Sequence, residues 1–222
     1  MLAKQLSNNS FTPLHISDDI SSAINKMDAW QTENIPVLDP ATLKIVGQAV
    51  FSNLTDVDDK SAIISDINLQ PPVFAFENEH IFEVARKMLH HEVRFMALVD
   101  QSESYIGIIE KKDVLEAFSK MLNVATFGSV ITVEMAEADF TLSKLVNVIE
   151  SEGAKILGLT VDHQNDNSSR LQVSLKLNLQ DTSAVTSALE RHGYVTTTEN
   201  RHDMIQIDLT SRADELMRYL DL

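Results

Sequence analysis

The first half of the chain contains the same sequence pattern twice. In each copy, a run with helical spacing precedes an apolar run that ends in Asp, and a stretch led by glycine follows. These three parts lie at residues 20–27, 35–39 and 47–50, and again at residues 81–88, 96–100 and 107–110. Most of these positions repeat at a spacing of sixty-one residues. A repeated supersecondary unit cannot bury its apolar face alone, so we expect the copies to pack together and to form a ligand cleft between them.

Apolar periodicity predicts the same element order in both copies, which is strand, helix, strand, strand and helix. We expect strands at 13–16, 35–38, 44–51, 73–76, 95–99 and 105–110, with helices at 19–31, 79–91 and 111–122. The stretch 56–70 is polar and acidic, and Pro71 and Pro72 end it. We interpret this stretch as the connector between the copies.

Residues 124–200 differ in character and predict the order βαββαβ, which is the ferredoxin-like unit. We expect strands at 129–134, 154–161, 171–177 and 194–198, with amphipathic helices at 140–151 and 182–192. The chain is thus expected to be an α/β (α+β) protein with three parts. These are a pair of repeats in residues 1–123 (copies about 10–60 and 70–123), a ferredoxin-like domain in 124–200, and a strand and helix extension in 201–222.

Composition excludes several classes of function. The formal net charge is -15, which disfavours a nucleic-acid partner because phosphate binding needs a basic surface. The absence of cysteine excludes disulfides, thiol nucleophiles and Cys-ligated zinc. No run is long and apolar enough to span a membrane, and the first residues lack a secretory pattern, so we expect a cytoplasmic protein. No catalytic motif is present, and we expect a protein that is not an enzyme.

The repeated unit resembles the CBS domain, whose tandem pair, the Bateman module, binds adenosine compounds. The resemblance rests on the prolines before each first strand, on the helices with Ala23 and Met27 and with Ala85 and Met88, and on the runs at 35–39, 96–100 and 107–113. The segment that follows resembles an ACT domain, a regulatory module that often binds amino acids. A CBS pair followed by an ACT-like domain is similar to the acetoin-utilisation accessory protein family.

The resemblance implies a nucleotide site that includes a set of residues from both copies. These are Asp113, Glu110, Asn53, Arg94, Pro72 and Val73. Asp113 matches the Asp that holds ribose hydroxyls in CBS domains, and we expect an adenosine ligand at this motif rather than at the motif of the first copy, where Asn53 is neutral. The alternative role of Asp113 is structural, as an acidic residue in the first turn of a helix. Glu110 stands where the family has Thr or Ser, and Val50 and Asn53 replace both motif residues in the first copy. Because a carboxylate repels phosphate, we expect an adenosine moiety with few or no phosphates, or no ligand.

The ACT-like resemblance implies a second site, in the loop after the first strand of the third segment. Its residues are Asp139, Phe140, Thr141 and Leu142, and an amino-acid-like effector is expected there. The loop lacks the glycine that ACT domains often carry. No metal site is expected, because the adjacent His90 and His91 cannot share one face of a helix.

The favoured hypothesis is a ligand-sensing regulatory protein with no obligatory cofactor, whose small-molecule effectors control a partner enzyme or transporter. A homodimer is expected because apolar helix faces extend beyond what one pair can cover. These faces carry Ile81, Val84, Met88, Leu115, Phe118 and Leu122. The alternative hypothesis is an interaction or scaffold protein whose CBS and ACT pockets are degenerate and empty.

Overall fold

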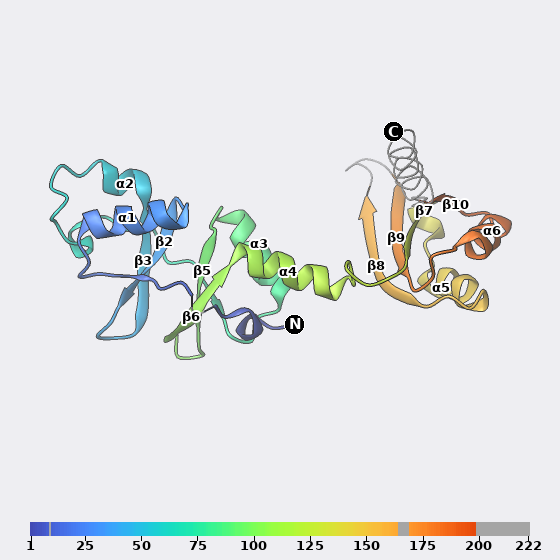
Figure 1. The fold of residues 1–222 in the computed structure, drawn as a ribbon, viewed down its shortest axis with the longest axis horizontal. Coiled ribbons are helices and arrows are strands. Elements are labelled where there is room, and N and C mark those ends of the chain that lie inside the picture. Colours follow the sequence, from blue (N-terminus) through green and yellow to red (C-terminus); the bar gives the residue numbers. More distant parts are fainter. Residues whose placement is uncertain (9, 164–168, 199–222) are drawn as a thin grey trace, which may run out of the picture. The chain divides into compact units, whose positions relative to one another are not determined.

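The computed structural model describes residues 1–8, 10–163 and 169–198, and these form two compact units (Figure 1). The first unit holds residues 1–118, and the second unit begins at Ser119, compared with the boundary expected at residue 123. The strand and helix expected in residues 201–222 lie outside the described residues.

Both copies of the repeat fold into the predicted elements. The first copy contains β1 (Leu14–His15), α1 (Ile20–Trp30), β2 (Asn34–Asp39), β3 (Lys44–Val50) and α2 (Phe51–Thr55). The second contains β4 (Phe74–Phe76), α3 (Ile81–His90), β5 (Phe95–Val99), β6 (Tyr105–Glu110) and α4 (Lys111–Met121). Each copy forms a three-stranded sheet in chain order, with a parallel first pair and an antiparallel second pair. The tandem repeat predicted from the sequence is confirmed.

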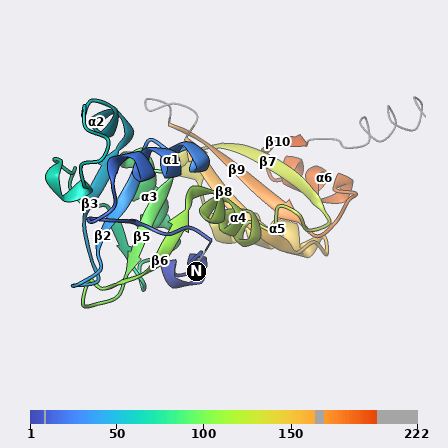
Figure 2. The same cartoon turned by 60° about the vertical axis from the view of Figure 1, so that its left-hand side comes forward.

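The two copies pack through their central strands, β2 and β5, which lie side by side in Figure 2. Leu38 and Ile45 from the first copy meet Ala97 and Val99 from the second in one apolar cluster. Tyr105 packs against this cluster, and burial raises the pKa of its phenol to about 12. The interface between the copies thus has an apolar cluster of its own, separate from the core clusters of the two copies.

The segment that precedes each copy pairs with the last strand of the other copy. Asn8 bridges to Ile108 in β6, and Gln70 bridges to Gln48 in β3. The repeated glycine makes this approach possible, because a Cβ added at Gly47 would lie 2.6 Å from the Leu69 Cβ. Such a contact is too close for any side chain. The glycine of each copy therefore lets the segment that precedes the other copy approach its last strand.

The stretch 56–70 is more than a connector, and our interpretation of it is corrected. Ile64 is fully buried in the core of the first copy, and Val57, Ile67 and Leu69 pack against that core. A main-chain hydrogen bond also connects the segment to α1, since the Ile20 N–H donates to the Ala62 carbonyl over 3.0 Å. The segment is therefore an integral part of the first copy.

The apolar face expected to support dimerisation also needs correction. Ile81, Val84 and Met88 are buried within the core of the second copy, so they are not available to a partner. The large apolar side chains that α3 and α4 leave exposed are Phe82, Leu89, Leu115 and Met121. The prediction failed for the first three because the apolar stripe of α3 covers its own sheet.

The second unit has the predicted ferredoxin-like topology. Its elements are β7 (Ser129–Ala136), the 3₁₀ turn η3 (Glu137–Asp139), α5 (Leu142–Ser151), β8 (Ile156–His163), β9 (Arg170–Leu177), α6 (Ser183–Arg191) and β10 (Val195–Thr198). The strand order is β10-β7-β9-β8, and every neighbouring pair is antiparallel. Both helices lie on one side of the sheet in Figures 1 and 2, and buried side chains of α5 and α6 share a core with the strands.

Candidate ligand-binding sites

The expected nucleotide-site residues separate into two groups at the interface between the copies. Arg94, Glu110 and Asp113 lie together at the end of the second copy's sheet. Pro72 and Val73 instead line a cavity on the other side of the repeat, next to β3. Asn53 belongs to this second group by position, because α2 begins directly after Val50, which pairs with the cavity residue Asn34.

Arg94 links the two copies through a buried carboxylate and a helix end. Its Nη2 and Nε lie 2.9 and 3.2 Å from Glu110 Oε1, and the Glu110 side chain is only 10% exposed. Its Nη1 donates to the carbonyls of Trp30 and Gln31, over 2.6 and 3.1 Å, where α1 ends. Helix-end carbonyls have no intrahelical donor, so the guanidinium satisfies them and neutralises Glu110 at the same time. The repulsion that we expected between Glu110 and phosphate is thereby reduced.

Asp113 is engaged in local structure. Its Oδ2 accepts from the Glu110 backbone N–H and from Asn8 Nδ2, each over 3.3 Å. This geometry satisfies an otherwise free N–H at the start of α4, as a capping side chain does. A ligand at Asp113 would compete with both contacts.

Aromatic side chains fill the space beside Arg94. The rings of Phe11, Trp30 and Phe95 contact one another, with centroids between 4.5 and 5.5 Å apart. Arg94 lies over Phe95 at 5.2 Å, and Lys26 lies over Trp30 at 4.8 Å. Burial lowers the pKa of Lys26, and attraction to Asp18 partly offsets this effect. We call the three rings together with Arg94 and Glu110 the Arg94 cluster.

The equivalent space on the other side of the repeat is open. A cavity of about 150 Å³, here called the Gln48 pocket, lies between the two copies of the first unit. It is lined by Asn34, Gln48, Gln70, Pro71, Pro72, Val73, His91 and Val93. None of these residues is Lys or Arg. Asn34 Oδ1 and Gln48 Oε1 are buried and have no hydrogen-bond partner among the described residues.

The repeat explains why one position is filled and the other is open. At the sixty-one-residue spacing, Phe11 corresponds to Pro72, Trp30 to His91 and Phe95 to Asn34. These substitutions replace three contacting rings by smaller or more polar side chains. A comparison of the two copies at this spacing is the signal in the sequence that locates the open pocket, and it singles out Asn34 and His91, which sequence reasoning missed.

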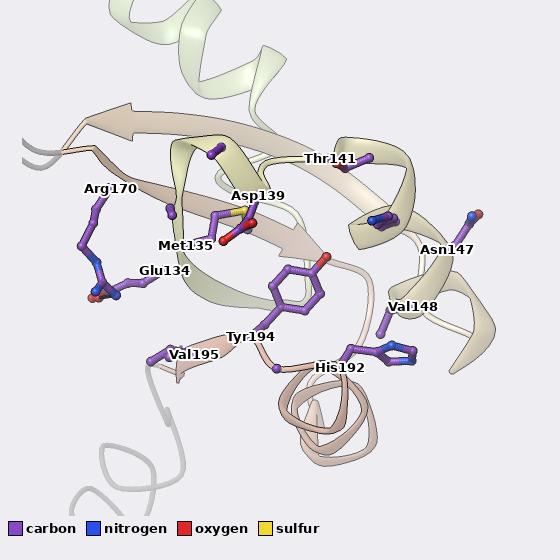
Figure 3. A pocket seen from close by; sticks show the side chains of 14 residues that line it. Glu134, Met135, Asp139, Thr141, Asn147, Val148, Arg170, His192, Tyr194 and Val195 are labelled. Carbon is purple, nitrogen blue, oxygen red and sulfur yellow. Dashed lines mark ion pairs between the residues drawn. The ribbon is translucent and has the colours of Figure 1, made fainter.

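A larger cavity lies in the second unit. This Tyr194 cleft has a volume of about 830 Å³ and lies between the 136–141 loop, the first turns of α5 and the segment that joins α6 to β10 (Figure 3). Its walls carry the acidic side chains of Glu134 and Asp139 and the basic side chains of Lys144 and Arg170. The Tyr194 ring stands in the middle of the group of side chains in Figure 3.

The four residues expected in the ACT-like loop are placed differently. Asp139 and Thr141 line the Tyr194 cleft, whereas Phe140 packs into the core of the unit and Leu142 is exposed at the start of α5. Helix α5 begins at Leu142, two residues later than expected, because η3 and a short extended stretch take up the preceding residues. No local sequence pattern marks the charged residues of the distant strands. Arg170, for example, lies 3.6 Å from Glu134 through the pairing of β9 with β7.

Two further features bear on the class of site. Among residues 1–8, 10–163 and 169–198, no group of three or more His, Asp or Glu side chains is arranged to hold a metal ion. No helix in the same residues has the length and apolar character that crossing a membrane requires.

Comparison with known proteins finds a CBS domain in the chain. Residues 64–120 match the CBS domain family. The inosine-5'-monophosphate dehydrogenase of Methanocaldococcus jannaschii is 28% identical over 99 residues, which make up 45% of this chain and 20% of that enzyme. The chain therefore matches only about a fifth of the length of this curated relative.

Solved structures that resemble the chain are CBS proteins. A CBS domain pair/ACT domain protein from Thermotoga maritima is 24% identical, with a TM-score of 0.49 over 55% of this chain and 99% of that one. The protein CBSX2 in complex with AMP is 18% identical, with a TM-score of 0.45 over 54% and 96% of the two chains. The CBS domain of a bacterial CNNM/CorC family Mg²⁺ transporter in complex with ATP is 18% identical, with a TM-score of 0.43 over 52% and 85%.

Proposed function

We propose, from the premise that the chain contains a CBS domain, that it is a regulatory protein whose first unit binds an adenosine-containing ligand. CBS domains commonly bind adenosine compounds and regulate partners. The observation that carries the proposal here is the Gln48 pocket, which joins an open volume to two buried amide oxygens without donors. Such oxygens are costly to leave unpaired, so a ligand that supplies N–H groups gains affinity by satisfying them.

The size of the Gln48 pocket supports a ring as the buried part of the ligand. An apolar cavity of about 150 Å³ holds one benzene ring in another protein. The pocket has the same volume, so it has room for one aromatic ring, and we propose that one ring of a purine enters it while the rest of the nucleoside lies toward the surface. Asn53 on α2 lies on this side of the repeat, and we propose that it meets the ribose.

The charge of the lining supports a ligand with few or no phosphates. Among the lining residues, His91 is the only one with an ionisable side chain, and no Lys or Arg is present. Arg94, which lies beside the CBS motif of the second copy, already pairs with Glu110. A nucleotide with several phosphates that used Arg94 as its cation would have to break that ion pair. A ligand bound at Asp113 would have to break the hydrogen bonds by which Asp113 caps α4. We therefore place the ligand in the Gln48 pocket and not at Asp113, where the motif predicted it.

We propose a second effector site in the Tyr194 cleft. The resemblance of the second unit to an ACT domain predicts an amino-acid-like ligand there. The cleft presents acidic side chains that suit an ammonium group and basic side chains that suit a carboxylate. Asp139 and Thr141, expected from the sequence, both line it. This combination favours a zwitterion over a ligand of one charge sign.

The proposal extends to the assembly and to its output. Exposed Phe82, Leu89 and Leu115 offer an apolar surface on the first unit for a homodimer, and a monomer mass in light scattering at micromolar concentration would contradict it. Ligand binding would favour one packing of the subunits and so control a partner enzyme or transporter in the cytoplasm.

A thermal-shift panel of adenosine compounds and amino acids tests the proposal against the scaffold alternative. A ligand that binds the folded state alone raises the melting temperature by mass action. We expect adenosine to raise it more than ATP does at equal concentration. No shift by any compound at millimolar concentration would favour a scaffold whose pockets are empty.

A further inference from the structure

The Tyr194 cleft continues into a second, smaller cavity of the second unit. This cavity has a volume of about 210 Å³, and its walls include Ser151, Glu152, Ala188 and Arg191. Asn147, Val148 and His192 line both cavities, so they mark the place where one cavity leads into the other. Figure 3 shows Val148 and His192 at this edge of the Tyr194 cleft. We call the two cavities together the α5 groove.

The α5 groove follows one face of α5 from its first turn to its end. Lys144 lines the Tyr194 cleft, Val148 lines both cavities, and Ser151 and Glu152 line the smaller one. Spacings of three and four residues place these side chains on one side of the helix. Glu152 follows Lys144 by eight residues, which at a rise of about 1.5 Å per residue corresponds to about 12 Å. An extended peptide spans about 3.3 Å per residue, so this length matches three to four residues.

The volume of the α5 groove exceeds what one free amino acid fills. A cavity of about 150 Å³ holds a benzene ring, which has six non-hydrogen atoms. On this scale the Tyr194 cleft, with about 830 Å³, has room for roughly thirty non-hydrogen atoms. No free amino acid approaches this number, whereas a peptide of three or four residues does. The volume and the length of the groove therefore indicate a ligand of the same size.

The charges of the lining suit a chain with two charged ends. Asp139 and Lys144 line the cleft, and Glu152 and Arg191, which are 3.4 Å apart, line the smaller cavity. Both cavities thus offer an acidic and a basic side chain, and a peptide with a free ammonium and a free carboxylate finds an opposite charge at each end. Between them, the side-chain amide of Asn147 can both donate and accept hydrogen bonds, as a peptide group requires.

We infer that the effector of the second unit is a short peptide of three to four residues with free ends, in place of a single amino acid. The inference rests on the proposed effector site in the Tyr194 cleft and extends that site past Val148 and His192 into the smaller cavity. The Tyr194 ring, in the middle of the cleft in Figure 3, offers an apolar surface to one side chain of the peptide.

Calorimetric titration of the full chain with alanine and with trialanine tests the inference. We expect trialanine to bind at least about tenfold more tightly, because it adds contacts with charged groups in the smaller cavity. N-acetyl-trialanine amide, which has no charged ends, is expected to lose this gain. Affinity for trialanine no higher than for alanine would overturn the inference, and the effector site would still stand if an amino acid of the thermal-shift panel bound. If no amino acid and no peptide bound, the site itself would be refuted.

Two variants test whether the ligand reaches the smaller cavity. Ser151 and Glu150 are adjacent exposed residues of α5, and Ser151 is the one that lines the groove. We expect Ser151→Trp to weaken trialanine about tenfold and to leave alanine unchanged, because the indole ring fills the smaller cavity alone. Glu150→Trp places the same ring outside the groove and is expected to alter neither ligand. If Ser151→Trp weakened both ligands equally, or bound trialanine as Glu150→Trp does, the inference would be wrong.

Discussion

Replacing Arg94 by alanine is expected to lower the free energy of unfolding by about 2–3 kcal/mol. The substitution leaves the Glu110 carboxylate, which is nearly buried, without its partner. It also removes the donor to the carbonyls of Trp30 and Gln31 at the end of α1. The expected loss lies below the range for fully buried pairs because the Arg94 side chain is 42% exposed. Urea denaturation followed by circular dichroism measures it.

Two further variants separate the role of Arg94 from a general effect of losing an arginine. Arg86→Ala removes an ion pair with Glu83 in which both side chains are exposed, and we expect a loss below about 0.5 kcal/mol. Adding Glu110→Gln to Arg94→Ala removes the orphan charge and is expected to recover part of the stability. If Arg94→Ala cost no more than Arg86→Ala, the Arg94 cluster would not hold the two copies together.

Replacing Ile64 by alanine is expected to cost about 3 kcal/mol, within the range for large-to-small changes in a core. Ile64 is fully buried, and the apolar side chains of the first copy surround it. The adjacent Ile63 is 40% exposed and serves as the matched control, since Ile63→Ala removes the same atoms one residue earlier. We expect a loss below about 1 kcal/mol for the control. Similar losses in the two variants would show that residues 56–70 connect the copies without belonging to the core.

The regular elements could be predicted from the sequence because each has a clear apolar period. Strand β5 coincides with the expected bounds, as does β6, and the three long helices of the first unit begin within two residues of them. The packing of residues 56–70 could not be predicted from an apolar period. Their buried side chains are isolated ones such as Ile64, which follow no period and find their places only when the sheet of the first copy has formed.

The candidate sites could be predicted from the sequence only in part, because a motif does not show which side chains surround it. A motif locates residues along the chain, whereas a pocket depends on which neighbours fill the space around them. Asp113 and Glu110 match the motif position, yet the structure engages the first in a helix cap and the second in an ion pair. The open volume lies where the repeat has Pro72 in place of Phe11. Long-range pairs such as Arg170 with Glu134 depend on strand pairing that no local pattern reveals.

The central claim is that adenosine binds the first unit in the Gln48 pocket. Calorimetric titration of adenosine into the full-length chain and into His91→Trp tests it most directly. His91 is an exposed residue that lines the pocket, so a larger ring there blocks the entrance and leaves the core untouched. His90→Trp places the same ring on the adjacent exposed residue, outside the pocket lining. We predict that adenosine binds the wild type and His90→Trp equally and that His91→Trp abolishes binding. Equal binding to all three proteins, or none to the wild type, would contradict the claim.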